Sequence, residues 1–341
     1  MPLSRRRFLE LSGLTLGAFS IGGVGCAALG SQGGTDAAEA VELAEPVASV
    51  SVTTRSGIRI HGVQTGWISI KSNHYHMRGP ESLKELNILL DTRWTEPKPI
   101  LSWVIEHPEG LIVIDSGERA GARDLATYLA CADAGSRYFI TRNFRVNVAP
   151  ESELGPQLVK LGLSPANVRW CVQTHLHFDH ANGFDFLPNA AVLVARTELE
   201  GHRTTPNGAV FCKYPSDFDP LALDYLQTYK GFSGHYPLTE AGDVVVVPTP
   251  GHSYGHQSVL LEGGDQTLFF AGDVTYDERQ LLEGEVSGIN VGVDATKASM
   301  AATRAYLAAT PSVYLPSHDP QSLQRLQRLQ TTEIKESHVD S

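Results

Sequence analysis

Three histidines and an aspartate stand within six positions of this 341-residue chain, as His175, His177, Asp179 and His180. They follow residues 168–173, an apolar run rich in β-forming residues that predicts a buried strand. Side chains alternate along extended backbone, so His175 and His177 project to the same side. Asp179 and His180 come after a turn, which Gly183 permits, and they face a second point. Imidazoles and carboxylates suit zinc and similar divalent ions, and the segment therefore predicts one or two metals.

Three downstream strands are each predicted to end at a small residue that is followed by a possible ligand. The predicted strands are 244–247, 267–270 and 312–315, and the ligands that follow them are His252, Asp273 and His318. A rigid sheet presents functional groups on the loops at its strand ends. The three residues therefore join the first four as candidate metal ligands.

These seven residues resemble the ligand series of the metallo-β-lactamase superfamily, over roughly residues 50–330. The series is His-x-His-x-Asp-His, then Gly-His, Gly-Asp and Ser-His. Within the superfamily, the chain is most similar to the N-acyl homoserine lactonases. The narrower likeness rests on the first motif, on residues 249–258, Thr-Pro-Gly-His-Ser-x-Gly-His-Gln-Ser, and on Tyr276 after Asp273.

The resemblance implies two divalent metal ions, with zinc favoured, and a ligand set for each. The first set is His175, His177 and His252. The second is Asp179, His180 and His318, with Asp273 bridging the two. Three or four protein ligands per metal leave room for a shared water, as in catalytic sites. The implied chemistry is attack of a metal-bridging hydroxide on a lactone or ester such as N-acyl homoserine lactone.

Other residues receive roles from the same likeness. Tyr276 is expected to contact the substrate carbonyl, and Asp179 to hand a proton to the leaving alkoxide. His256 and Asp115 are expected behind the ligands, where a carboxylate accepts the second N–H of a ligand histidine. His74 repeats the His-x-His spacing with His76, but in a polar stretch with no strand directly before it, and we leave both out of the ligand set.

The elements that must position these residues alternate between strand and helix patterns. Further strands are predicted at 50–54, 57–63, 67–71, 100–106, 111–114, 191–195 and 258–262, and helices at 123–132, 154–161 and 295–308. The order favours an α/β fold, an αββα sandwich of two mixed β-sheets flanked by helices, over residues 47–330. Periodicity alone leaves a doubly wound sheet open.

Two segments interrupt this pattern. Residues 203–237 carry seven Phe and Tyr residues, which fit either an apolar wall over the metal site for an acyl chain or an excursion packed on the sheet. Residues 138–150 form a second insertion, for which the sequence predicts no element.

The N-terminus reads as a targeting segment rather than part of the fold. Residues 4–9, Ser-Arg-Arg-Arg-Phe-Leu, form a twin-arginine signature before the apolar, glycine-rich stretch 11–29. We expect residues 1–40 to be signal and linker, with export to the periplasm by the twin-arginine machinery. Cys26 stands where a lipoprotein carries its lipid, cleavage after Ala40 is the competing prediction, and an uncleaved anchor helix is the alternative.

The net charge and the cysteine count limit the possible binding partners and the possible chemistry. The net charge of −11 argues against non-specific binding to nucleic acid or anionic lipid. Three cysteines follow the signal, namely Cys131, Cys171 and Cys212, an odd count that is no disulfide framework, although one pair could form after export. We expect Cys171 in the core and no cysteine nucleophile. The sequence leaves the oligomeric state open.

The function expected is that of an exported dinuclear metal hydrolase that opens a lactone or ester. A phosphotriesterase or a β-lactamase would use the same metals on another electrophile. A mononuclear iron oxygenase of the same fold needs only three protein ligands, so the full set counts against it. A non-catalytic binding module is disfavoured because no ligand position is missing.

Overall fold

The metal motif is carried by two β-sheets in the computed structural model, which describes residues 48–204, 211–214 and 218–335. These residues belong to one compact unit, Leu43–Ser341. The predicted signal, residues 1–40, lies outside the described residues.

The larger sheet has the strand order β1-β2-β3-β4-β6-β7-β8, with β5 paired to β2. Pairing is antiparallel from β1 to β4 and parallel from β4 through β6 and β7 to β8, so the sheet is mixed. Its strands are β1 (Ser49–Thr53), β2 (Arg59–Ile70), β3 (Lys98–His107), β4 (Gly110–Ile114), β5 (Phe144–Asn147), β6 (Val168–Val172), β7 (Ala191–Ala195) and β8 (Leu221–Leu223).

The smaller sheet has the order β13-β12-β11-β10-β9 and is also mixed, because only β12 and β13 run parallel. Its strands are β9 (Tyr236–Pro237), β10 (Val244–Pro248), β11 (Gln257–Leu261), β12 (Thr267–Gly272) and β13 (Ser312–Pro316). The helices of the fold are α2 (Ser72–Tyr75), α3 (Lys84–Leu90), α4 (Leu125–Tyr128), α5 (Ala134–Asn143), α6 (Leu154–Lys160), α7 (Phe178–Ala181), α8 (Arg196–Thr204), α9 (Glu278–Glu283), α10 (Val293–Ala309) and α11 (Ser322–Arg328).

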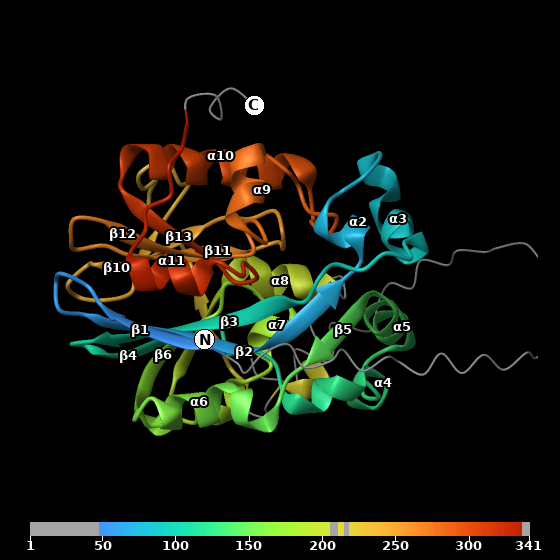
Figure 1. Cartoon of the computed structure of the whole chain (residues 1–341), viewed down its shortest axis with the longest axis horizontal. Coiled ribbons are helices and arrows are strands. Elements are labelled where there is room, and N and C mark those ends of the chain that lie inside the picture. The colour runs from blue at the N-terminus through green and yellow to red at the C-terminus, as the bar shows by residue number, and fades with distance from the viewer. Residues whose placement is uncertain (1–47, 205–210, 215–217, 336–341) are drawn as a thin grey trace, which may run out of the picture. The chain divides into compact units, whose positions relative to one another are not determined.

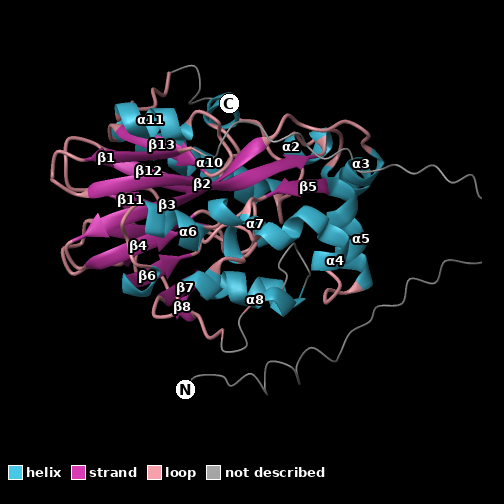
Figure 2. Ribbon diagram, turned by 60° about the horizontal axis from the view of Figure 1, so that its bottom comes forward, coloured by secondary structure: helices cyan, strands magenta, loops and turns pink. Residues whose placement is uncertain are grey.

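Alternating side chains along the strands build the layers. In β12, Leu268 and Phe270 enter the core between the sheets, whereas Phe269 faces outward and packs with Tyr306 of α10. On the other side, Val113 of β4 packs with Leu158 of α6. Figure 1 shows α10 outside one sheet and α6 outside the other, and Figure 2 shows the strands turned toward the viewer. The predicted αββα sandwich is confirmed.

Two element predictions are wrong in detail. The strands predicted at 57–63 and 67–71 are one long strand, β2, which continues through Gly66 with a register shift against β3. Glycine is needed there because a Cβ would lie 2.6 Å from the Val148 side chain. The helix predicted at 123–132 is instead a 3₁₀ turn, Ala120–Asp124, followed by the short α4.

The insertion at 138–150 is structured. It forms the end of α5 and all of β5, which pairs antiparallel with the end of β2. Local sequence patterns cannot reveal such a pairing, because its two strands are far apart in the chain.

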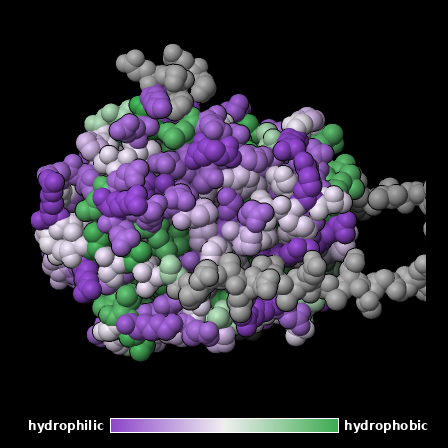
Figure 3. All heavy atoms as spheres, viewed as in Figure 1, coloured by the Kyte–Doolittle hydropathy of each residue, from purple (hydrophilic) through white to green (hydrophobic). Residues whose placement is uncertain are grey.

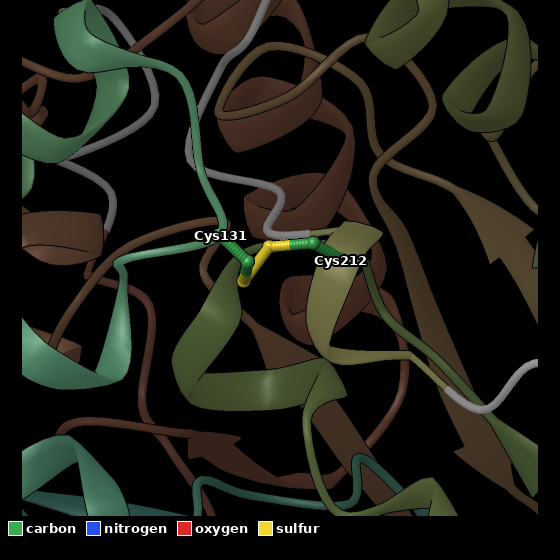
Figure 4. The surroundings of a disulfide bond; sticks show 2 residues. All are labelled: Cys131 and Cys212. Carbon is green, nitrogen blue, oxygen red and sulfur yellow. A yellow bond between two sulfur atoms is a disulfide. The ribbon is translucent and has the colours of Figure 1, made fainter.

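One cysteine pair does form. Cys131, after α4, is bonded to Cys212 in the 3₁₀ turn Phe211–Lys213, and Figure 4 shows the bond joining these two segments. Cys171 is free and buried in β6, as expected. The disulfide spans 81 residues and ties the start of α5 to the segment after α8.

The outer surface is mainly hydrophilic on the face shown in Figure 3, with smaller hydrophobic areas. Among the described residues, no helix is both long enough and apolar enough to cross a bilayer.

Candidate metal centre

The seven predicted ligands come from four strand ends. His175 and His177 follow β6, Asp179 and His180 lie on α7, and His252, Asp273 and His318 lie within four residues of the ends of β10, β12 and β13. All seven side chains are buried. Their ligand atoms form three groups in which every atom lies within 4.8 Å of the others: His175, His177 and His252; His175, His180 and Asp273; and Asp179, His180 and His318.

Two of these groups coincide with the two sets that the resemblance implies. Asp273 lies between them, because its Oδ2 is 3.3 Å from Nε2 of His252 and 3.5 Å from Nε2 of His318. A carboxylate in that position reaches both groups. The structure thus brings together all seven predicted residues, while their role as ligands stays a prediction.

The seven side chains fit metal ions, because several of their nitrogen and oxygen atoms are buried and converge without ordinary hydrogen-bond partners in the described part of the chain. Nε2 of His175 and Oδ1 of Asp273 are buried without a hydrogen-bond partner among the described residues. Nδ1 of His177 lies 2.9 Å from Nε2 of His252, and the Nε2 atoms of His180 and His318 lie 3.2 Å apart. Buried polar atoms are normally paired, so converging nitrogens of this kind suit cations, and imidazole and carboxylate together suit zinc.

Protonation favours the ligand form at His175 and Asp273, whereas burial is outweighed by Asp273 at two other histidines, so that the pKa of His180 is raised well above its usual range and that of His318 to about 9. Burial, together with the neighbouring His180 and His177, holds the pKa of His175 well below its usual range, so this imidazole is neutral. Burial alone would raise the pKa of Asp273, but the surrounding histidines, His318 foremost, hold it well below its usual range. Neutral imidazole and ionised carboxylate are the forms that bind metal.

Asp115 supports the second group, as predicted. It lies after β4 at a φ of 59°, and its Oδ2 accepts a hydrogen bond from Nδ1 of His180 at 2.8 Å. The same carboxylate accepts from the backbone N–H of Thr174 at 2.7 Å and from its hydroxyl at 2.8 Å. The tautomer of His180 is thereby fixed with Nε2 directed at the ligand cluster.

Glu198 supports the first group, and sequence reasoning missed it. This buried residue of α8 accepts hydrogen bonds from the backbone N–H of Leu176 at 2.9 Å and of Gly255 at 2.7 Å, and from the Ser253 hydroxyl at 2.7 Å. One carboxylate therefore joins the loop of His175 and His177 to the loop of His252. The only signal in the sequence was an acidic residue shortly after the predicted strand 191–195.

His256 also lies behind the ligands, as predicted. Its Nε2 accepts a hydrogen bond from the backbone N–H of Asp273 at 2.9 Å, and its Nδ1 contacts the Thr249 hydroxyl at 2.9 Å. The structure corrects the reason given for Gly183. Its φ of −92° is open to any residue, but a Cβ would lie 2.1 Å from the backbone oxygen of Ser116. Close packing, not turn geometry, requires this glycine.

A cavity of about 500 Å³ opens onto the cluster. Five of the predicted ligands are among its lining residues: His177, Asp179, His252, Asp273 and His318. Its walls are mostly apolar and come from β2, α5, β5 and the segment before α10, with Ile68, Ile70, Phe139, Ile140, Phe144, Ile289 and Val291. The insertion at 138–150 therefore supplies much of the wall.

The acyl-wall interpretation of residues 203–237 is not supported. None of the described residues in that segment lines the cavity. Phe218 stacks on Phe184, with ring centroids 4.9 Å apart, and Phe232 packs against Tyr306 at 5.8 Å. The alternative, an excursion packed on the fold, describes these residues.

Tyr276 lies in the cavity between the two ligand groups. Its ring centroid is 5.7 Å from that of His252 and 5.6 Å from that of His318. Its hydroxyl lies 2.9 Å from Nε2 of His74, which is buried in the cavity wall. No ligand group among the described residues contains His74, which was left out of the predicted ligand set. The reason given for leaving it out was wrong, since α2 follows the end of β2 almost directly. His76 instead lies outside the cavity lining, with its Nδ1 2.9 Å from a carboxylate oxygen of Glu285.

Comparison with known proteins agrees with this geometry. Residues 95–318, more than half of the chain, match the family model described as the metallo-beta-lactamase superfamily. A curated relative, N-acyl homoserine lactonase AttM of Agrobacterium fabrum, is 28% identical over 224 residues, which are 65% of this chain and 82% of the relative. An N-acyl homoserine lactonase of a Bacillus species is 26% identical over 164 residues, 48% of this chain and 58% of that protein.

Solved structures show the same fold. An N-acyl homoserine lactone hydrolase with the product N-hexanoyl-L-homoserine bound at its catalytic metal centre superposes with a TM-score of 0.61 at 17% identity, covering 78% of this chain and 94% of that one. The dizinc quorum-quenching lactonase AidC superposes with a TM-score of 0.53 at 15% identity, covering 80% and 91%. With the family match and the assembled ligand cluster, it follows that the chain belongs to the metallo-beta-lactamase superfamily and is a metal-dependent hydrolase.

Proposed function

We propose that the protein opens the ring of N-acyl homoserine lactones or related lactones and esters. One observation carries the proposal: the same cavity is lined by five of the clustered metal-ligand side chains and by a wall that is mostly aliphatic and aromatic, with Lys84, Glu85, Lys98 and Asp133 as its charged members. A substrate with a polar ester ring and an apolar acyl chain matches both parts. The volume of about 500 Å³ lies in the range of small-molecule sites. The names of the curated relatives point to the same substrate class.

The seven clustered side chains would hold two metal ions, and their imidazole-rich composition favours zinc. When bound, such ions lower the pKa of a shared water and polarise a carbonyl group. The remaining work falls to this chain. Tyr276 would donate a hydrogen bond to the carbonyl oxygen as it becomes negative. Asp179, which also lines the cavity, would take up the proton that the attacking water gives up and pass it to the leaving alkoxide.

A substrate panel tests this proposal. The zinc-loaded protein should convert N-acyl homoserine lactones to the ring-opened N-acyl homoserines with a higher kcat/KM than it shows for a phosphotriester or a β-lactam. His318→Ala, which removes one clustered imidazole, serves as the inactive control. Turnover confined to the phosphotriester or the β-lactam would contradict the proposal.

We also propose export by the twin-arginine route to the periplasm, with Cys26 as a lipid anchor if the lipoprotein cleavage is used. The disulfide between Cys131 and Cys212 supports an oxidising compartment, because such bonds are rare in the cytosol. Twin-arginine export carries proteins that are already folded, which suits a fold built around a metal cluster.

A further inference from the structure

His74 lies in the cavity wall but has no part in the function proposed above. It is 3% exposed and packs edge-on against Phe144, with ring centroids 5.0 Å apart. Its Nε2 lies 2.9 Å from the hydroxyl oxygen of Tyr276. Its Nδ1 is buried and has no hydrogen-bond partner among the described residues.

The backbone around His74 is held in place by the segment that precedes α10. The backbone N–H of Gly288 donates to the oxygen of His74 at 2.8 Å, and that of Met77 donates to the oxygen of Val286 at 2.9 Å. A Cβ at Gly288 would lie 2.0 Å from the backbone oxygen of Asn73. The backbone of His74 is therefore fixed by close packing and by two backbone hydrogen bonds, which hold the imidazole in the cavity wall.

The hydrogen bond to Tyr276 decides which ring nitrogen of His74 carries the proton. Burial lowers the pKa of His74 to about 3, so the ring is neutral and has one N–H. A proton on Nδ1 would be a buried donor without an acceptor, which is rare in proteins. A proton on Nε2 is satisfied by the oxygen of Tyr276. The Nε2–H tautomer therefore leaves no buried donor unpaired, and we take it as the form of His74.

This tautomer has a consequence for the Tyr276 phenol, which has a single O–H donor. If Tyr276 donated that proton to His74, it could not donate it to a substrate. If Tyr276 accepts from His74, its proton stays available, and accepting a hydrogen bond strengthens a hydroxyl as a donor. Ser287, another polar neighbour of the phenol, donates its own proton to the backbone oxygen of Ile289 at 2.7 Å, so its oxygen is an acceptor with which a substrate carbonyl competes for the Tyr276 proton.

We propose that His74 is a positioning residue that donates a hydrogen bond from Nε2 to Tyr276 and so directs the Tyr276 proton toward the substrate carbonyl. The proposal rests on the lactone hydrolysis proposed above. It gives the chain a His–Tyr pair in which His74 acts through Tyr276 and does not bind metal.

A double-mutant cycle tests the pair. His74→Leu removes the donor and should lower kcat for a lactone roughly 5-fold, with little change in KM, since one hydrogen bond is lost in the transition state. His74→Gln, which keeps an N–H donor near the same position, should recover most of that loss. In the Tyr276→Phe background, His74→Leu should cause no further loss, because no phenol proton remains to be directed. An equal loss in both backgrounds would overturn the proposal.

His76→Gln is the matched control, because His76 is the neighbouring histidine two positions on but lies against Glu285 instead of Tyr276. The kcat of this variant should equal that of the wild type. A second measurement needs no substrate. Nitrogen NMR of zinc-loaded, histidine-labelled protein, with the His74 signal assigned from its absence in His74→Gln, should show the Nε2–H tautomer. The Nδ1–H tautomer would overturn the proposal. Absence of lactone turnover in the wild type would instead refute the proposed function, and the tautomer would still decide the role of His74.

Discussion

Tyr276 stands at the point where the two ligand groups and the apolar cavity meet, with its ring less than 6 Å from those of His252 and His318. A hydrogen bond to the oxygen that becomes negative during attack strengthens in the transition state, so its loss should fall on kcat. Tyr276→Phe should therefore lower kcat for a lactone roughly 10-fold, less than a typical oxyanion-hole donor because metals share the charge. Steady-state kinetics at equal zinc loading measure this. A wild-type kcat in the variant would mean that Tyr276 only packs.

Glu118 predicts a pH effect on the stability of the fold. Burial raises its pKa from 4.5 to about 8, although Arg119, Tyr128 and Asn182 donate hydrogen bonds to it. Between these two values the folded protein keeps a proton that the unfolded chain releases. The free energy of unfolding should thus fall as pH rises from 4.5 to 8, by at most about 1.4 kcal/mol per pH unit.

Glu118→Gln removes this titration. The stability of the wild type relative to the variant should decline across that pH window and stay level above it, as measured by urea unfolding at several pH values. A difference that does not change with pH would show that Glu118 is already ionised in the folded protein.

At the scale of elements, α8 links the two loops that carry the first ligand group. Glu198→Gln keeps the size of the side chain but gives up acceptor capacity toward Leu176, Ser253 and Gly255. Because groups behind metal ligands typically matter 10- to 100-fold in metal affinity, we expect one of two zinc ions to bind roughly 10-fold more weakly. Competition with a chelator measures the two affinities in turn.

Glu200→Gln is the control for that experiment, since Glu200 is exposed on the same helix. Unchanged zinc affinities in Glu198→Gln would show that the two loops hold their ligands without this bridge.

The cavity wall yields a second prediction at this scale. Phe139 of α5 lines the cavity, so Phe139→Ala should lower kcat/KM for long-chain N-acyl homoserine lactones roughly 10-fold more than for short-chain ones. Phe218→Ala removes an aromatic ring from the segment 203–237 that packs on Phe184 instead. This control should lose thermal stability without changing the ratio between long and short chains. A loss of long-chain preference in Phe218→Ala but not in Phe139→Ala would instead show that the segment 203–237 contacts the acyl chain.

The sequence predicted the ligand cluster better than its surroundings for a physical reason. Each ligand follows a strand that its own apolar run makes recognisable, and parallel strand ends bring such loops together. The α5 wall, the pairing of β5 with β2 and the bridge from Glu198 depend on contacts between residues distant in the chain. The strand predicted at 67–71 ends within one residue of the true end of β2. What the sequence could not show is the contact of His74 with Tyr276, because the two residues are 202 positions apart in the chain.

At the scale of the whole molecule, the described unit carries a disulfide, and the sequence before it carries a twin-arginine signature. If Arg5 and Arg6 direct export, replacing both with lysine should leave the precursor in the cytoplasm, which fractionation and immunoblotting would show. Radioactive fatty acid incorporated only when Cys26 is present would identify a lipoprotein. Normal processing and export of the double-lysine protein would contradict the twin-arginine route.

The central claim is that two metal ions held by the seven clustered side chains make this protein a lactone hydrolase. The most direct test is a titration of zinc into the metal-free protein, with the rate of lactone ring opening measured at each step. We predict that activity rises to a maximum at about two equivalents of zinc and that excess chelator abolishes it. Full activity at one equivalent, or a requirement for iron with consumption of oxygen, would contradict the account.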